Sequence, residues 1–407
     1  MSKEISDTAE LARWITQSAT ASDDGESLLK NYSLALVAAG IPVWRLGVSM
    51  PALDPTASSF SLIWTSDEGV VLSQTPHGEE NEVAFRQSPI QSLLEKSEVF
   101  GRWRLDALGV GDPFPVLHEF KSAGGTDYVL YLVAFTPGTA LRGVAISFVT
   151  REPTGFSASQ MAALADLIPA LGLAMCKLAF SHTLRHTLGT YLGAATGTHV
   201  LGGQIRRGEG RTIWAAILLT DLRGFTALAD RQDPTEVVGW LDEHFEAVGE
   251  PIAASGGEIL KFMGDGFLAV FPVSAPEIHP CIDCESALQA AVAARAANRR
   301  LNEMRRARHL PALEVDIVLH FGEVVYGNVG TDRRLDFTVI GRAVNEASRI
   351  EKLCGDLDRS ILISDSFANR CRYALDAVGS VSLRGLEHSQ RVWTLPDGNM
   401  PLAHSTA

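Results

Sequence analysis

The chain has 407 residues, of which 46% are hydrophobic and 20% charged, a balance typical of globular domains with full cores. Its length predicts two domains, and the formal net charge of −13 makes nucleic acid an unexpected partner. Five cysteines, an odd number, and an N-terminus without a basic start and apolar run predict a cytoplasmic protein.

Residues 1–180 are predicted to form one α+β unit. The pattern resembles small sensor domains of the GAF or PAS kind, an interpretation at the level of the fold that leaves the regulatory ligand unknown. The expected strands and helices are an amphipathic start at Ala9 to Ala39, strands at Phe60 to Thr65, Tyr128 to Phe135 and Gly143 to Thr150, and helical segments at Val83 to Lys96 and from Ser157.

One apolar stretch, Met161 to Phe180, approaches the length of a membrane span. Asp166 and Lys177 interrupt it, and it opens with a capping-box pattern from Ser157 to Gln160. We therefore expect a soluble helix and no membrane span.

Residues 181–211 are rich in glycine, threonine and histidine and are predicted to be a helical connector. Residues 212–395 follow as a second domain, and residues 396–407 as a disordered tail. The second domain's expected elements are a buried strand at Ile213 to Thr220, a helix capped by Asp233, a hairpin of Glu258 to Met263 and Phe267 to Phe271, a helix at Glu285 to Arg308, short strands at Glu314 to Phe321 and Val324 to Gly327, a helix at Gly341 to Leu353 and a strand at Ser360 to Ser364. Apolar residues recur at three- and four-residue steps from Val237 to Ile252, which predicts a buried face on the helix capped by Asp233.

Two aspartates stand at predicted strand ends. Asp221 follows the buried strand, where it is either a helix N-cap or a functional carboxylate, and Asp265 lies at the hairpin tip, where aspartate also suits a turn. If the strand and hairpin are neighbours, the two carboxylates repel each other and a divalent metal relieves that repulsion. The pair therefore predicts a metal site.

Four segments strengthen this prediction by their order in the chain. They are Asp221-Leu222-Arg223-Gly224-Phe225-Thr226, Lys261-Phe262-Met263-Gly264-Asp265-Gly266, His320 to Gly330 and Ile340 to Arg349. Together they resemble the class III nucleotidyl cyclase catalytic domain over roughly Gly210 to Leu395. The resemblance implies an α+β fold with a ferredoxin-like βαββαβ core, two divalent cations (Mg²⁺ or Mn²⁺) and a nucleoside triphosphate substrate.

The resemblance also implies roles for individual residues. Asp221, Asp265 and the backbone carbonyl of Leu222 match the metal ligands. Lys261 matches the base-recognition lysine, and a lysine donor favours adenine, so ATP is the expected substrate. Thr338 takes the partner base-recognition position, where many adenylyl cyclases carry aspartate. A threonine there is similar to class IIIb, which suggests regulation by bicarbonate or pH.

Asn345 and Arg349 lie four residues apart on one helical face, as a surface pair also would. The resemblance assigns Asn345 to the ribose and Arg349 to the transferred phosphoryl group, whose negative charge a guanidinium meets well. Arg384 stands where the family often has a lysine for the terminal phosphates. In this family the metal and base residues come from different subunits, which implies a homodimer.

The resemblance therefore implies an adenylyl cyclase, which converts ATP to cyclic AMP. Two alternatives stay open on the sequence. One is a cyclase of other substrate choice, guanylyl or mixed, and the other is a catalytically silent regulatory module that only binds nucleotide or a partner. The pair Cys281 and Cys284 does not predict zinc, because a structural zinc site needs four ligands.

Overall fold

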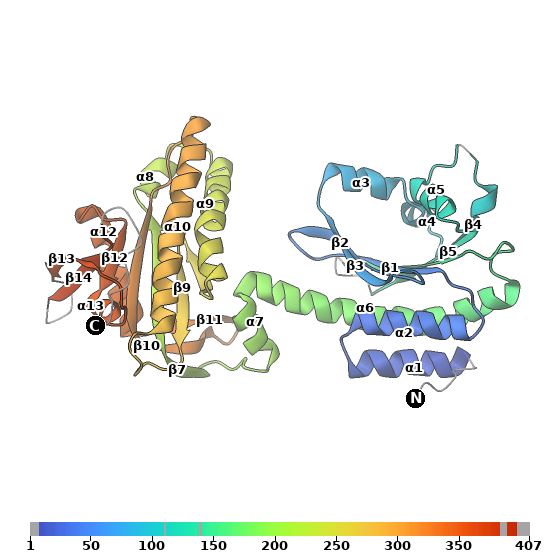
Figure 1. Ribbon diagram of the computed structural model, residues 1–407, viewed down its shortest axis with the longest axis horizontal. Coiled ribbons are helices and arrows are strands. Elements are labelled where there is room, and N and C mark those ends of the chain that lie inside the picture. Colours follow the sequence, from blue (N-terminus) through green and yellow to red (C-terminus); the bar gives the residue numbers. More distant parts are fainter. Residues whose placement is uncertain (1–7, 110, 137, 139–140, 383–388, 397–407) are drawn as a thin grey trace. The chain divides into compact units, whose positions relative to one another are not determined.

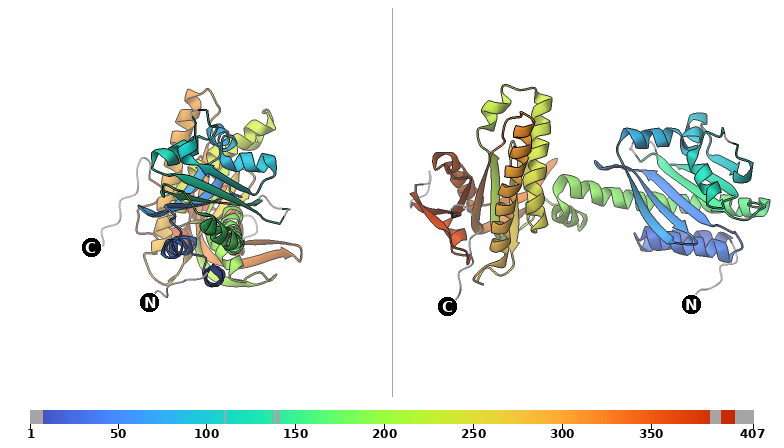
Figure 2. Two further views of the ribbon diagram at one scale, coloured as in Figure 1. Left: turned by 90° about the vertical axis from the view of Figure 1, so that its right-hand side faces the viewer. Right: turned by 45° about the horizontal axis from the view of Figure 1, so that its top comes forward.

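The computed structural model describes residues 8–109, 111–136, 138, 141–382 and 389–396. The chain divides into two compact units, Met1–Thr187 and Leu188–Ala407, shown in Figures 1 and 2. Helices and strands occur in both units, so the predicted α+β class is confirmed.

The first unit is built on a six-stranded sheet in the order β3-β2-β1-β6-β5-β4, antiparallel at every pairing. The predicted strands correspond to β2, β5 and β6, whereas β1, β3 and β4 were not predicted. The strands are β1 (Arg45–Pro51), β2 (Ala57–Thr65), β3 (Gly69–Pro76), β4 (Phe100–Arg104), β5 (Asp127–Ala134) and β6 (Gly143–Thr150).

Helices cover both faces of this sheet (Figure 1). On one face lie α1 (Thr8–Ala21), α2 (Gly25–Ala38) and α6 (Ala158–Leu192); on the other lie α3 (Glu79–Arg86), α4 (Pro89–Lys96), the 3₁₀ turn η1 (Leu105–Ala107) and α5 (Pro115–Ser122). The single helical segment predicted at Val83 to Lys96 is two helices. Ser88 caps the second by accepting a hydrogen bond from the Gln91 amide, and Pro89 occupies its first turn.

Helix α6 begins one residue after Ser157, which forms the predicted capping box with Gln160. In the described part of the chain it is the one helix long and apolar enough to span a membrane, and half of its most apolar window is buried. Leu164, Leu171 and Met175 belong to the core cluster beneath the sheet. Part of this apolar segment therefore packs in the core of the first unit.

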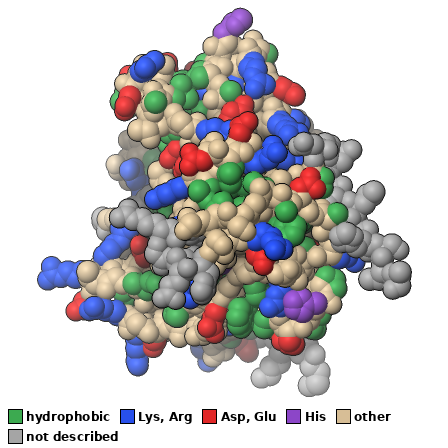
Figure 3. Space-filling view, turned by 90° about the vertical axis from the view of Figure 1, so that its left-hand side faces the viewer, with side chains coloured by type: hydrophobic (Ala, Val, Ile, Leu, Met, Phe, Trp, Pro, Cys, Tyr) green, Lys and Arg blue, Asp and Glu red, His purple; other side chains and the backbone are tan. Residues whose placement is uncertain are grey.

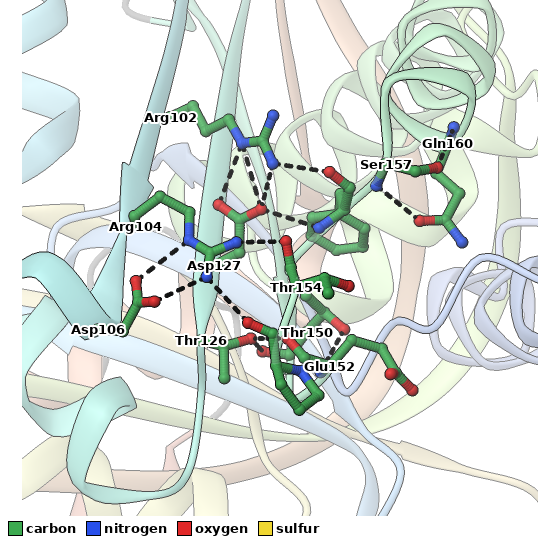
Figure 4. Close-up of polar contacts among 12 residues, drawn as sticks. Arg102, Arg104, Asp106, Thr126, Asp127, Thr150, Glu152, Thr154, Ser157 and Gln160 are labelled. Atoms are coloured by element: carbon green, nitrogen blue, oxygen red, sulfur yellow. Dashed lines mark hydrogen bonds and ion pairs between the residues drawn. The ribbon is translucent and has the colours of Figure 1, made fainter.

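A buried carboxylate fixes the start of α6 against the sheet (Figure 4). Asp127 of β5 is fully buried, pairs with Arg102 of β4 at 2.6 Å and accepts a hydrogen bond from the Phe156 amide. Arg102 also donates to the Phe156 carbonyl. Because both carboxylate oxygens of Asp127 accept hydrogen bonds, the burial of this charge is compensated.

The core of the second unit follows the sequence β-α-β-β-α-β. Its strands pair in the order β10-β7-β9-β8, all antiparallel, which is the ferredoxin-like arrangement that the resemblance implied. The elements are β7 (Gly210–Leu222), α9 (Pro234–Ala254), β8 (Glu258–Met263), β9 (Gly266–Val273), α10 (Ile282–Ala307) and β10 (Val315–Thr331).

Smaller elements extend this core. The sheet continues from β10 through β12 (Ile361–Ser364) and β14 (Gln390–Thr394) to β13 (Asp376–Val381), and β11 (Arg334–Ile340) forms a hairpin with β10. The short helices are α7 (Ala194–Leu201), α8 (Phe225–Ala229), α11 (Arg342–Glu351), α12 (Leu353–Asp356) and α13 (Asp365–Ala368).

On the face drawn in Figure 3, acidic and basic side chains are interspersed, and no broad basic surface is present there.

Helix α9 shows how the sequence specifies one of these elements. Asp233 caps it by accepting a hydrogen bond from the Thr235 amide at 2.8 Å, and Pro234 takes the first position. Val248 and Ile252 are buried in the core shared with α10 and the sheet. The predicted cap and buried face are both confirmed.

The strand prediction after α10 was wrong. Val315–Thr331 is one continuous strand that runs through Gly322 and Glu323, where a break between two short strands was expected. A Cβ on Gly322 would lie 2.6 Å from the Cβ of Ala343 on α11. This glycine provides room for a helix to cross the strand and does not form a turn.

The predicted connector, residues 181–211, contains the end of α6, all of α7 and the start of β7. The predicted tail lies outside the described residues from position 397 onward.

Candidate active site

The two aspartates meet where β7 ends. Asp221 is the penultimate residue of β7, and Asp265 lies in the turn between β8 and β9. A Cβ on Gly266 would lie 1.9 Å from the Thr220 carbonyl oxygen, so only glycine allows this turn to approach β7. The close approach brings Asp265 near enough to perturb Asp221 electrostatically. The alternative of Asp221 as a helix N-cap is wrong, because Gly224 precedes α8.

Burial, followed by the negative charges of Asp265 and Glu351, raises the pKa of Asp221 to about 7. Glu351, at the end of α11, shares a hydrogen bond with Asp221, and burial raises its pKa as well. In the described ranges, neither Asp221 nor Asp265 forms an ion pair with a lysine or arginine. The site is therefore a cluster of carboxylates whose charge the described residues do not compensate.

The carboxylates at the end of β7, with their uncompensated negative charge, suit a divalent cation. The described residues contain no ready-formed group of three or more His, Cys, Asp or Glu ligands. Magnesium does not need one, because it is commonly held by one or two carboxylates together with substrate phosphates. Asp221 and Asp265 are two such carboxylates, and the Leu222 carbonyl is a further oxygen next in sequence.

The two predicted base-recognition residues lie on neighbouring strands. Lys261 of β8 is exposed and opposite Leu268, while Thr338 of β11 is opposite Gly327. Strands β8 and β11 contact each other. Thr338 is only 5% exposed, and its hydroxyl has no hydrogen-bond partner among the described residues. An orphaned buried hydroxyl is costly, so this one is available to a ligand.

Asn345 and Arg349 share one face of α11, the helix that packs against β10 and β7. Asn345 is exposed and Arg349 is partly buried. Within the described chain no side-chain hydrogen bond or ion pair engages either residue, so both side chains are free to bind a substrate. Arg384 lies outside the described residues.

A polar link that the sequence did not predict lies beside this site. Glu258 of β8 accepts hydrogen bonds from the amide and hydroxyl of Thr196 on α7, at 3.0 and 2.8 Å, and from the Tyr326 hydroxyl at 2.7 Å. His199 of α7 stacks on Phe337, next to Thr338, with ring centroids 5.8 Å apart. Helix α7 therefore contacts both strands that carry the predicted base-recognition residues. No sequence motif marks Glu258.

A comparison with protein families agrees with this geometry. Residues 211–396 match the model described as "Adenylate and Guanylate cyclase catalytic domain". This part of the chain is therefore a catalytic domain of the adenylate and guanylate cyclase family. The GAF or PAS resemblance of the first unit stays a prediction.

Relatives match part of the chain. An "Adenylate cyclase" of Anabaena cylindrica is 35% identical over 192 residues, which cover 46% of this chain and 36% of that protein. "Adenylate cyclase 1" of Rhizobium meliloti (strain 1021) is 34% identical over 166 residues, covering 40% of this chain and 24% of the relative. The alignments thus span about a third or less of these relatives' lengths.

Solved structures also resemble part of the chain. The adenylyl cyclase CyaB from P. aeruginosa matches with a TM-score of 0.43 and 25% identity, over 48% of this chain and 100% of that one. The guanylyl cyclase Cya2 matches with a TM-score of 0.41 and 31% identity, over 48% and 99%. With both TM-scores below 0.5, neither structure decides between adenine and guanine.

Proposed function

We propose that the protein is an adenylyl cyclase that converts ATP to 3′,5′-cyclic AMP and pyrophosphate. The observation that carries this proposal is the uncompensated carboxylate pair of Asp221 and Asp265 inside a cyclase catalytic domain. ATP is favoured by Lys261, a donor suited to adenine N1, and by the free hydroxyl of Thr338, an acceptor suited to the exocyclic amine. Two relatives named adenylate cyclases support the same choice.

In the reaction, the ribose 3′-oxygen forms a bond to the α-phosphorus of the same molecule. The bond from that phosphorus to the pyrophosphate oxygen breaks, and the hydroxyl proton passes to solvent. Asp221, Asp265 and the Leu222 carbonyl would hold two divalent cations, whose positive charge would acidify the hydroxyl and neutralise the triphosphate.

The other residues orient and neutralise the substrate. Asn345 positions the ribose through its amide, and Arg349 meets the negative charge that develops on the α-phosphoryl oxygens. Lys261 and Thr338 fix the adenine. Arg384 is proposed to contact the terminal phosphates.

We further propose that two copies of the chain share each site. Hydrophobic side chains are exposed around the site residues, and in a monomer this exposure does not contribute to stability. Phe262 and Met263, directly after Lys261, are 57% and 40% exposed, and the cross-strand neighbours Val325 and Ile340 are 48% and 45% exposed. A two-fold dimer that covers these residues would complete two equivalent sites.

The decisive experiment supplies purified full-length protein with ATP or GTP, in the presence of Mg²⁺ or Mn²⁺, and separates the products by chromatography. We expect cyclic AMP as the main product and its loss in Asp265→Ala. A preference for GTP would contradict the substrate assignment. Absence of any cyclic nucleotide with either metal would show a silent binding module.

A further inference from the structure

A positive charge lies without an anionic partner on the sheet of the first unit. Arg45 begins β1 and is partly buried, and burial lowers its pKa. Among the described residues no carboxylate forms an ion pair with it. Its guanidinium has a long 3.5 Å contact with the Ser147 hydroxyl and lies 4.7 Å from the centroid of the Phe120 ring. Neither contact neutralises the charge.

A glycine makes room for this guanidinium on the sheet. A Cβ on Gly47 would lie 2.7 Å from Nη1 of Arg45 and 2.9 Å from the Ser147 hydroxyl. The side chain of Arg45 therefore lies along its own strand, over the position where any other residue would place a side chain. The guanidinium is held at the sheet surface and does not extend into solvent.

Hydroxyl groups lie on the same face of the sheet. Gly47 is opposite Ser147 on β6, and Ser49 is opposite Ser61 on β2, with their hydroxyl oxygens 2.8 Å apart. Side chains two residues apart in a strand share a face, so Arg45 and Ser49 point to the same side. That side is opposite to the core packed by α1, α2 and α6, because Leu46 and Val48 belong to that core.

Tyr128 of β5 adds a further hydroxyl. Burial raises its pKa to about 12, so it stays protonated and cannot serve as the counter-charge of Arg45. Its ring stacks on Phe120 at 5.6 Å, which places one aromatic wall beside the guanidinium. The guanidinium of Arg45 thus contacts both a hydroxyl, that of Ser147, and an aromatic wall.

We propose that this face of the sheet binds a small organic or inorganic oxyanion, a carboxylate or a phosphate, through Arg45. A planar guanidinium pairs with either group through two parallel hydrogen bonds. The Ser147 hydroxyl, which donates a long 3.4 Å hydrogen bond to the Gly47 carbonyl, can turn to donate to the anion, and the partial burial of the site strengthens each contact. The ligand supplies the negative charge that the described residues lack, and the first unit becomes an anion-responsive module.

The test measures anion binding to the full-length protein by calorimetry, without nucleotide and with EDTA, at constant ionic strength. Inorganic phosphate and succinate are the two probes, so the experiment distinguishes phosphate from carboxylate recognition. We expect one of them to bind the wild type, and Arg45→Gln to weaken that binding at least tenfold. Arg86→Gln, which changes an exposed arginine of α3, is the matched control and should bind as the wild type does.

A second variant guards against a folding defect in Arg45→Gln. Ser147→Ala keeps the positive charge and removes only the hydroxyl beside it, and it should weaken the same anion several-fold. If neither probe binds the wild type more tightly than it binds Arg45→Gln, the proposal is overturned. Because no nucleotide or metal is present, this result is independent of the cyclase activity.

Discussion

The guanidinium of Arg223 lies 2.6 Å from a carboxylate oxygen of Asp316, the residue directly opposite Asp221 on β10. A second hydrogen bond, 3.2 Å long, makes the contact bidentate. Four carboxylates, those of Asp221, Asp265, Asp316 and Glu351, would otherwise crowd the end of β7. Arg223 neutralises one of them and leaves Asp221 and Asp265 without a cation, which is the state that favours a bound metal.

Removal of this pair should destabilise the second unit. In Arg223→Gln, the carboxylate of Asp316, which is 8% exposed, loses its counter-charge, and we expect the free energy of unfolding to fall by about 1–3 kcal/mol. Arg334→Gln is the control, because its pair with Asp336 is 3.5 Å long and exposed on both sides, so the expected loss is below ~0.5 kcal/mol. Urea denaturation measures both. Equal losses would mean that the Arg223 pair has no special role.

The stability of the metal-free protein should depend on pH through Asp221. Its pKa is near 7 in the folded state and near 3.8 when unfolded, so between these values the folded state binds more protons. The free energy of unfolding should therefore decrease as the pH rises from about 4 to about 7. Above this window, added Mn²⁺ should restore the stability, because it relieves the repulsion with Asp265.

Thermal denaturation in EDTA at several pH values checks this expectation. Asp221→Asn removes the titrating group and should flatten the decrease. Asp242→Asn, which changes an exposed carboxylate of α9, should leave the slope as in the wild type. Parallel slopes for the wild type and Asp221→Asn would contradict the expectation that Asp221 causes this pH dependence.

Shared sites predict complementation between inactive variants. Asp265→Ala lacks a proposed metal ligand, and Arg349→Ala lacks the proposed phosphate contact, so each should lose at least ~100-fold in kcat. When the two variants are mixed in equal amounts, half of the dimers contain one intact site, and activity should recover to about a quarter of wild type. Arg342→Ala, an exposed position on the same helix, should remain active. A mixture that stays inactive argues against shared sites.

Base recognition should respond to the charge of residue 261. Lys261→Glu replaces a donor to adenine N1 with an acceptor, and the unmet polar contact should lower kcat/KM for ATP about 10–100-fold. The ratio of GTP to ATP turnover should increase. Lys30→Glu, an identical charge change at an exposed site on α2, is the control and should keep both rates. An unchanged ratio would mean that Lys261 is a solvent-exposed residue that does not contact the base.

Local sequence patterns were enough to predict much of the catalytic domain. The Asp233 cap, the periodic apolar face of α9 and the Gly-Asp-Gly turn are short-range signals, and each one predicted the element that forms. The family resemblance over Asp221 to Arg349 is likewise a property of the sequence, and the family comparison confirms it at the level of the domain.

Only the tertiary structure decided what these residues meet. Gly322 looked like a strand break, yet it is space for Ala343 of a crossing helix. The pairing of Arg223 with Asp316 and the hydrogen bond between Asp221 and Glu351 join residues that are far apart in the chain. The uncompensated charge of Arg45 is also invisible in sequence. Burial and charge balance depend on which strands become neighbours, and local propensity does not encode that choice.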